Sequence, residues 1–433
     1  MHIYYFMPKE LLEREWVQAK EEGKDISGIS ADLDGEEALK AVDELQNRPV
    51  SKDFPFDEPD TLDDIRAKRP HHVAKPAQAL NDEVLLDKIL GAWLGRSSGC
   101  WLGKPWEGFG MAKGKDGIKN VLVEANRYPM NDYLDFDYSD EFMQKHQLDP
   151  SLKGYKYRDF DGMPEDDDLN YTVIGLDIIK RHGHDFTAVD VANTWMMHLP
   201  VFHTYTAERI AYKNFLNLIS PPESGFYRNP YREWIGAQIR ADFWGYVNPG
   251  NPERAAEYAY RDACISHTKN GIYGEMFVAA AIAAAFVEDS IEAVIEAGLN
   301  QIPENCRLAA AIREFMEFAK TEPDFEKGLE YIYEKYGFYH PVHTINNALI
   351  VVAGLVYGNL DFSKTISIAV MGGWDTDCNG ATAGSILGAL LGAKKIPEKW
   401  IDPINDTLYT GVQGYNKVKI SDLAKETLDL IKK

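Results

Sequence analysis

Apolar residues recur with helical spacing along most of the chain. Leu169, Val173, Leu176 and Ile179 fall on one face of a predicted helix, and the run KRHG that follows is a favourable helix end. The same spacing predicts helices at about 205–218, 254–264, 275–288, 305–320, 324–336, 343–357, 362–371 and 379–393. Alternation typical of strands is scarce. The pattern therefore predicts an all-α fold.

Two further regions differ from this body. Residues 1–80 combine a mixed-charge helical stretch at 36–47 with a connector rich in proline and charge at 48–70, so we expect an accessory segment before a main domain at 81–433. This segment could cap a cleft, restrict substrates or bridge subunits. Residues 104–163 are aromatic, contain glycine and lack periodicity, which predicts long loops.

Glycine recurs every fourth residue in two predicted helices, GAWLGRSSGCWLG at 91–103 and GATAGSILGALLG at 380–392. Each interior helical glycine costs about 1 kcal/mol relative to alanine. Spacing by four places these glycines on one ridge, where a second backbone can approach closely. We therefore expect tight helix packing at both stripes, which would also fix the loops at their ends.

Charge and cysteine content exclude several classes of protein. The 433 residues carry a formal net charge of −22, which argues against nucleic acid or anionic lipid as a main partner. The four cysteines form no CxxC pair, which favours a reducing cytoplasm. The N-terminus lacks the apolar region of a signal peptide, and no run of eighteen apolar residues predicts a membrane span.

Candidate chemistry is concentrated in two acidic clusters. In PEDDDLNYT, Glu165 and Asp166–Asp168 precede a predicted helix. Acidic residues are favourable in the first turn of a helix, but four of them repel one another. Two interpretations are therefore open, a charged helix cap or a binding site for a cation. In GGWDTDCNG, Asp375 and Asp377 stand two apart before a second helix. Two such clusters are the pattern of a binuclear site for hard cations, Mg²⁺, Mn²⁺ or Ca²⁺.

Three motifs give the chain a resemblance to the ADP-ribosylglycohydrolase family: GAWLGRSSGCWLGKPWEG at 91–108, PEDDDLNYTVIGL at 164–176 and GGWDTDCNGATAGSILGALLG at 372–392. The resemblance spans roughly residues 85–395. It implies a compact all-α bundle with a central metal cleft that holds two Mg²⁺ or Mn²⁺ ions. It also implies hydrolysis of the bond at ribose C1 of an ADP-ribosyl group on a protein or a small molecule.

Carried over by position, the resemblance implies the metal ligands Asp166, Asp167, Asp168, Asp375, Asp377 and Cys378, with Glu165 as a further candidate. Glu107 matches a loop glutamate that approaches the metals and substrate, and either Glu107 or Asp168 would take a proton during hydrolysis. Three departures mark a divergent branch: Cys100 stands where the family commonly has an aspartate, and Asp166 and Cys378 stand where it often has threonine.

Other positions are candidates for substrate binding. Gly372 and Gly373 could attract the diphosphate through backbone amides. Arg240 could meet a phosphate or form an ion pair, Tyr273 could stack on adenine or fill the core, and His267 could bind substrate or serve as a structural hydrogen bonder. Two alternatives remain open: a hydrolase of another ribosyl or glycosyl metabolite, and a non-catalytic protein that binds ADP-ribose.

Overall fold

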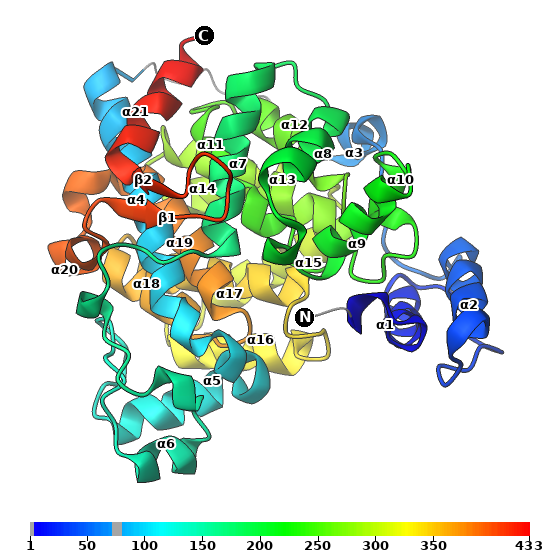
Figure 1. The fold of residues 1–433 in the computed structure, drawn as a ribbon, viewed down its shortest axis with the longest axis horizontal. Helices are drawn as coiled ribbons and strands as arrows, with labels where there is room; N and C mark the ends of the chain where they lie inside the picture. The colour runs from blue at the N-terminus through cyan, green and yellow to red at the C-terminus, as the bar shows by residue number, and fades with distance from the viewer. Residues whose placement is uncertain (1–3, 72–79) are drawn as a thin grey trace.

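A computed structural model describes residues 4–71 and 80–433, and nearly all regular structure in these residues is helical (Figure 1), which confirms the all-α prediction. The N-terminal segment contains α1 (Pro8–Glu21), α2 (Gly35–Asn47) and α3 (Leu62–Lys68). The body follows with α4 (Asp82–Gly103), α5 (Glu107–Glu124), α6 (Asp140–His146), α7 (Asp167–His182), α8 (Ala188–His198), α9 (Thr206–Leu216), α10 (Glu223–Phe226), α11 (Asp242–Tyr246), α12 (Pro252–Ala263) and α13 (Lys269–Ala285).

The chain continues through α14 (Ile291–Leu299), α15 (Arg307–Ala319), α16 (Phe325–Tyr336), α17 (Thr344–Gly358), α18 (Phe362–Met371), α19 (Thr376–Leu391), α20 (Glu398–Ile401) and α21 (Ile420–Ile431). Within the described residues the only sheet is a small antiparallel pair, β1 (Thr407–Tyr409) and β2 (Lys417–Lys419), in which Leu408 pairs with Val418. The predicted helix at 362–371 coincides with α18, and most of the others differ from the observed bounds by a few residues.

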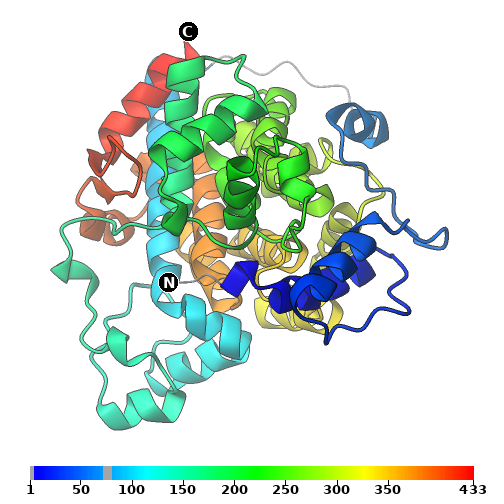
Figure 2. The same ribbon diagram turned by 45° about the vertical axis from the view of Figure 1, so that its right-hand side comes forward.

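Helices α4 and α19 run antiparallel through the middle of the bundle (Figures 1 and 2). Their glycine stripes face each other so closely that a Cβ atom on Gly99 would lie 1.9 Å from the carbonyl oxygen of Gly380. A Cβ atom on Gly95 would lie 2.1 Å from the carbonyl oxygen of Gly384. The predicted tight packing is therefore confirmed. It brings the C-terminal end of α4 beside the N-terminal end of α19.

The prediction of long loops over 104–163 is wrong in part, because α5 and α6 lie in this region. The sequence of α5, EGFGMAKGKDGIKNVLVE, contains four glycines that obscure its periodicity, and Gly114 breaks the helix with a φ of +61°. Only Gly110, Ile118, Val121 and Leu122 of α5 are buried. Packing against the bundle therefore stabilises α5, although the spacing of its apolar residues does not predict a helix.

The N-terminal segment lies against the outside of the body (Figure 2). Leu11 and Leu12 of α1 and Val42 and Leu45 of α2 share a small hydrophobic core with Ala207, Ile210, Tyr231 and Trp234 of the body. The predicted helix at 36–47 is confirmed as α2, whereas α3 lies within the stretch expected to be an irregular connector. All four cysteines are buried and free. No helix in the described ranges is long and apolar enough to cross a bilayer.

Candidate active site

A cavity of about 580 Å³ lies where the N-terminal ends of α5, α7 and α19 approach one another. One part of its wall is acidic and contains most of the predicted site residues. Another part is aromatic and polar and comes from the N-terminal segment, α9 and the loops near 234 and 340. The acidic part consists of Glu107, Glu165, Asp166, Asp167, Asp375, Asp377 and the neighbouring Cys378.

The turn that carries Asp375 and Asp377 is held from several sides. Trp374 has a φ of +55°, which is unfavourable for a bulky residue, and its ring stacks on Tyr333 with 4.1 Å between ring centroids. The Tyr333 hydroxyl donates to the carbonyl oxygen of Gly372 at 2.8 Å. The Oγ1 of Thr376 donates to the carbonyl oxygen of Gly103 at 2.8 Å, which ties α19 to the end of α4.

The first acids of the triple-aspartate run have different local partners. Asp166 is the N-cap of α7 and accepts a hydrogen bond from the backbone nitrogen of Asp168 at 3.0 Å, so the capping interpretation holds for this residue. Its other carboxylate oxygen lies 2.5 Å from the Lys104 Nζ. This lysine compensates the negative charge that an aspartate adds at this position. Asp167 lies in the cavity wall without a cap role.

Asp168 does not line the cavity, and one of its two carboxylate oxygens pairs with an arginine. It is fully buried, and its Oδ1 lies 3.0 Å from the Arg96 guanidinium, which also pairs with Asp242 at 2.8 Å. Arg96 further donates to the Oγ1 of Thr172 at 2.7 Å. This buried charge network fixes the first turn of α7 against α4 and α11.

Three groups of side chains lie close enough to share a cation: Glu107 with Asp375 and Asp377, Asp168 with Asp377 and Cys378, and Cys100 with Asp166 and Asp168. Within each group the possible ligand atoms lie within 4.8 Å of one another. Among the described residues, Oδ1 of Asp375, Oδ1 of Asp377 and Oδ2 of Asp168 are buried without a hydrogen-bond partner. Buried carboxylate oxygens without partners fit hard divalent cations, and Asp377 belongs to two of the groups.

The carboxyl groups oppose one another's ionisation. The Asp377 carboxylate, together with burial, raises the pKa of Glu107 well above its usual value. Burial and neighbouring carboxylates also raise the pKa values of Asp167 and Asp375, and they raise the pKa of Asp377 to about 6. Burial opposes ionisation of Asp166 as well, but the Lys104 ammonium outweighs it and lowers the pKa of Asp166. Such a cluster gains from a cation that neutralises its charges.

Comparisons with known proteins show the family of the chain. The model of the family described as ADP-ribosylglycohydrolase matches residues 81–433. The chain belongs to the ADP-ribosylglycohydrolase family. It is accordingly a hydrolase of the glycohydrolase type. A solved structure titled "ADP-ribosylglycohydrolase-related protein complex" is similar in fold, with a TM-score of 0.51 and 17% identity over 81% of this chain and 99% of the other. No curated protein sequence matches.

Several residues expected to bind substrate lie elsewhere in this ADP-ribosylglycohydrolase. Arg240 is buried and pairs with Asp262 at 2.7 Å and Glu208 at 3.2 Å, so its charge is already used within the protein. Tyr273 is buried, and its hydroxyl donates to the carbonyl oxygen of Pro59. His267 is buried with its Nδ1 2.8 Å from the Ser266 hydroxyl, and burial lowers its pKa well below the usual value.

Gly372 and Gly373 also lie outside the cavity wall. A Cβ atom on Gly373 would lie 2.6 Å from the backbone nitrogen of Lys115, and Gly373 has a φ of +76°. A Cβ atom on Gly372 would lie 2.5 Å from the Ile350 side chain. These glycines therefore allow close packing of the turn against α5 and α17, and their predicted contact with a diphosphate is not supported by their position.

Sequence reasoning missed two cations that organise the site. Lys104 follows the last glycine of the α4 stripe and pairs with Asp166. Arg96 lies in the glycine-rich stretch Gly91–Gly103 of α4, which is buried throughout, and a charge in such a position requires a buried partner. That placement could have identified Arg96 from the sequence as a buried, paired cation. The sequence around Lys104 does not distinguish it from a surface lysine.

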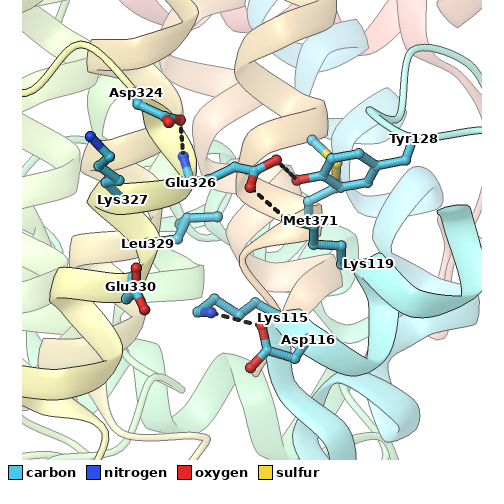
Figure 3. Close-up of a pocket in the computed structure, with 10 residues that line it drawn as sticks. All are labelled: Lys115, Asp116, Lys119, Tyr128, Asp324, Glu326, Lys327, Leu329, Glu330 and Met371. Atoms are coloured by element: carbon cyan, nitrogen blue, oxygen red, sulfur yellow. Dashed lines mark hydrogen bonds and ion pairs between the residues drawn. The ribbon is translucent and has the colours of Figure 1, made fainter.

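A separate cavity of about 370 Å³ lies between α5 and α16 (Figure 3). Its charged side chains pair largely with one another. Glu326 accepts hydrogen bonds from Lys119 at 2.5 Å and from the Tyr128 hydroxyl at 2.7 Å, and Lys115 pairs with Asp116 at 2.8 Å (Figure 3). None of the predicted site residues lines it. The acidic cavity at the ends of α5, α7 and α19 is therefore the candidate active site.

Proposed function

We propose that this ADP-ribosylglycohydrolase cleaves the glycosidic bond at ribose C1 of an ADP-ribosyl group, carried by a protein or by a small molecule, with two Mg²⁺ or Mn²⁺ ions. The observation that carries the proposal is the pair of acidic groups that share Asp377 beside a cavity of about 580 Å³. That volume lies within the range of nucleotide-sized ligand sites.

The side chains divide into two roles under this proposal. Asp375 and Asp377 would hold the cations together with Asp168 and Asp167, and Cys378 lies close enough to complete one group. Bound cations would orient ribose hydroxyls and stabilise negative charge next to C1. Burial raises the pKa of the Cys378 thiol well above its usual value, so Cys378 is a neutral thiol before a cation binds.

Glu107 is the better of the two candidates for the residue that takes a proton. Asp168 is fully buried and holds Arg96, whereas Glu107 is partly exposed and lines the cavity. Glu107 lies at the first turn of α5, next to Asp375 and Asp377. The Asp377 carboxylate favours the protonated form of Glu107, so cations that neutralise Asp375 and Asp377 would leave Glu107 as a carboxylate that can accept a proton from a water molecule attacking the ribose.

Titration calorimetry tests the proposal. The metal-stripped protein is titrated with Mn²⁺ and then with ADP-ribose. Two equivalents of Mn²⁺ followed by metal-dependent binding of ADP-ribose would support it. Binding of Mn²⁺ without ADP-ribose would redirect the search to another ribosyl or glycosyl compound. Absence of Mn²⁺ binding would leave Asp166 as a helix cap and refute the metal site.

A matched pair of variants sharpens this test. Asp377→Asn should lose Mn²⁺ and ADP-ribose binding, while its metal-free form should unfold at a higher temperature because repulsion with Glu107 and Asp375 is relieved. Asp361→Asn is the control, because Asp361 is an exposed N-cap of α18 and asparagine caps equally well. The control should bind both ligands as the wild type does.

A further inference from the structure

The N-terminal segment is joined to the body through buried ion pairs. Arg232 of the body lies 2.6 Å from Glu15 of α1 and 2.8 Å from Glu22, the residue that caps the C-terminal end of α1, and all three side chains are buried. Arg307 lies 2.7 Å from Glu58 in the stretch that follows α2. Removing one partner of such a pair would leave a buried charge uncompensated. These buried pairs therefore hold α1 and the stretch that follows α2 against the body.

This position places α1 in the wall of the active-site cavity. Tyr5, Glu10 and Arg14 line the same cavity as Asp375 and Asp377. The family match begins at residue 81. A segment outside the family match thus completes the site of this protein.

The wall around Arg14 is aromatic. Its guanidinium carbon lies 5.8 Å from the centroid of the Trp234 ring, and Trp234 stacks on His340 with 4.0 Å between centroids. Tyr231 meets Trp234 edge-to-face at 4.8 Å. Burial lowers the pKa of His340 to about 4, so this ring is neutral at pH 7. Flat neutral rings beside a cation suit a ligand that carries both a heteroaromatic base and an anion.

Arg14 is the cation of this wall that remains available to a ligand. Within the described residues that line the cavity, Arg14 and Lys104 are the only arginine or lysine side chains, and Lys104 is held by Asp166. Arg14 uses its Nε for a 2.9 Å hydrogen bond to Glu10, and its side chain is 38% exposed. Nη1 and Nη2 donate to no other side chain in the described part of the protein.

We propose that Arg14 binds the diphosphate of the substrate, so that the N-terminal segment selects ligands with an anionic group between the ribose at the metal centre and a base on the Trp234–His340 wall. This inference rests on the proposed function. A guanidinium matches phosphate oxygens in geometry and charge. It also adds local attraction for an anionic ligand on a protein whose net charge of −22 opposes such a ligand.

The experiment measures Mn²⁺ and ADP-ribose affinities of the full-length protein by calorimetry for four variants. Arg14→Gln should weaken ADP-ribose binding about ten-fold and leave Mn²⁺ affinity unchanged, because a charge-assisted hydrogen bond at a partly exposed site is lost. Arg14→Lys should weaken it less. Glu10→Gln should tighten it, because Arg14 is released from a competing carboxylate. Lys9→Gln is the control, since Lys9 is an exposed cation of α1 outside the cavity wall.

The outcomes separate this inference from the proposed function. Equal ADP-ribose affinity of wild type and Arg14→Gln, with equal Mn²⁺ affinity, would overturn the role of Arg14 and leave the proposed function standing. Weaker binding by Glu10→Gln would also overturn it, because the pair would then act as a structural unit. Failure of the Mn²⁺-loaded wild type to bind ADP-ribose would overturn both.

Discussion

The close contact of α4 and α19 predicts that alanine at a glycine inside the contact destabilises the protein, whereas alanine at an exposed helical glycine does not. In Gly99→Ala, the new Cβ would meet the Gly380 carbonyl oxygen at 1.9 Å, whereas ordinary contact begins near 3.4 Å. The helices would have to separate by about 1.5 Å over a fully buried interface, and both contacting groups are backbone that cannot rotate away.

The magnitude follows from two opposing terms. Alanine gains about 1 kcal/mol of helix propensity over glycine. Overpacking a buried interface costs about 1–3 kcal/mol, and more where the backbone must move. We expect Gly99→Ala to lose about 2 kcal/mol or more of the free energy of unfolding. Because Asp377 lies in the first turn of α19, Mn²⁺ affinity should fall as well.

Chemical denaturation followed by circular dichroism measures this loss. Gly108→Ala is the matched control: Gly108 is an exposed residue in the first turn of α5, and a Cβ atom there would meet nothing within 4 Å. The control should be unchanged or slightly more stable. Gly99→Ala with the stability of the wild type would refute the claim that the glycine stripe exists for close backbone contact.

Two further predictions concern pH and the metal turn. Burial, with the Glu233 carboxylate, raises the pKa of Glu21 from 4.5 to about 8, so between these pH values the folded state holds a proton that the unfolded state has released. The free energy of unfolding should therefore fall by about 1.4 kcal/mol per pH unit as the pH rises from 5 to 8. Chemical denaturation over this pH range should show that Glu21→Gln removes the slope and that Glu13→Gln does not. Tyr333→Phe should cost about 1 kcal/mol and weaken Mn²⁺ binding several-fold by calorimetry, because the Gly372 carbonyl loses its donor, whereas Tyr336→Phe on the same helix should not change Mn²⁺ affinity.

Local pattern was sufficient for much of the architecture. The 3.6-residue period located α18 and most of the long helices, because each buries one apolar stripe. The helices that it missed include α8, α14 and α21, and also α1, which has its own amphipathic stripe but stands among many charges, and α5, where glycines interrupt the pattern. The four-residue glycine repeat predicted close packing at both stripes, because four helical glycines are costly without it, and the structure shows that the two stripes pack against each other.

The candidate site was likewise predictable only in part from the sequence. The two aspartate clusters are visible in the sequence because like charges so close together require a partner. Which aspartate faces the cavity is not visible: Asp167 lines it, while Asp168 turns inward to Arg96. Arg240, Tyr273 and His267 each have a partner inside the protein, which favours the structural alternative that the sequence left open for each of them.

The sequence by itself determined the all-α class, the close packing expected at each glycine stripe and the two acidic clusters at helix starts, because these depend on spacing along one chain. Only the tertiary structure decided that Lys104 neutralises Asp166 and that Arg14, far from every motif, lies in the cavity wall. The physical reason is that charge pairing and cavity walls depend on distances in space between residues remote in sequence. For Arg14 those distances are set by buried ion pairs, such as Arg232 with Glu15, that no local pattern encodes.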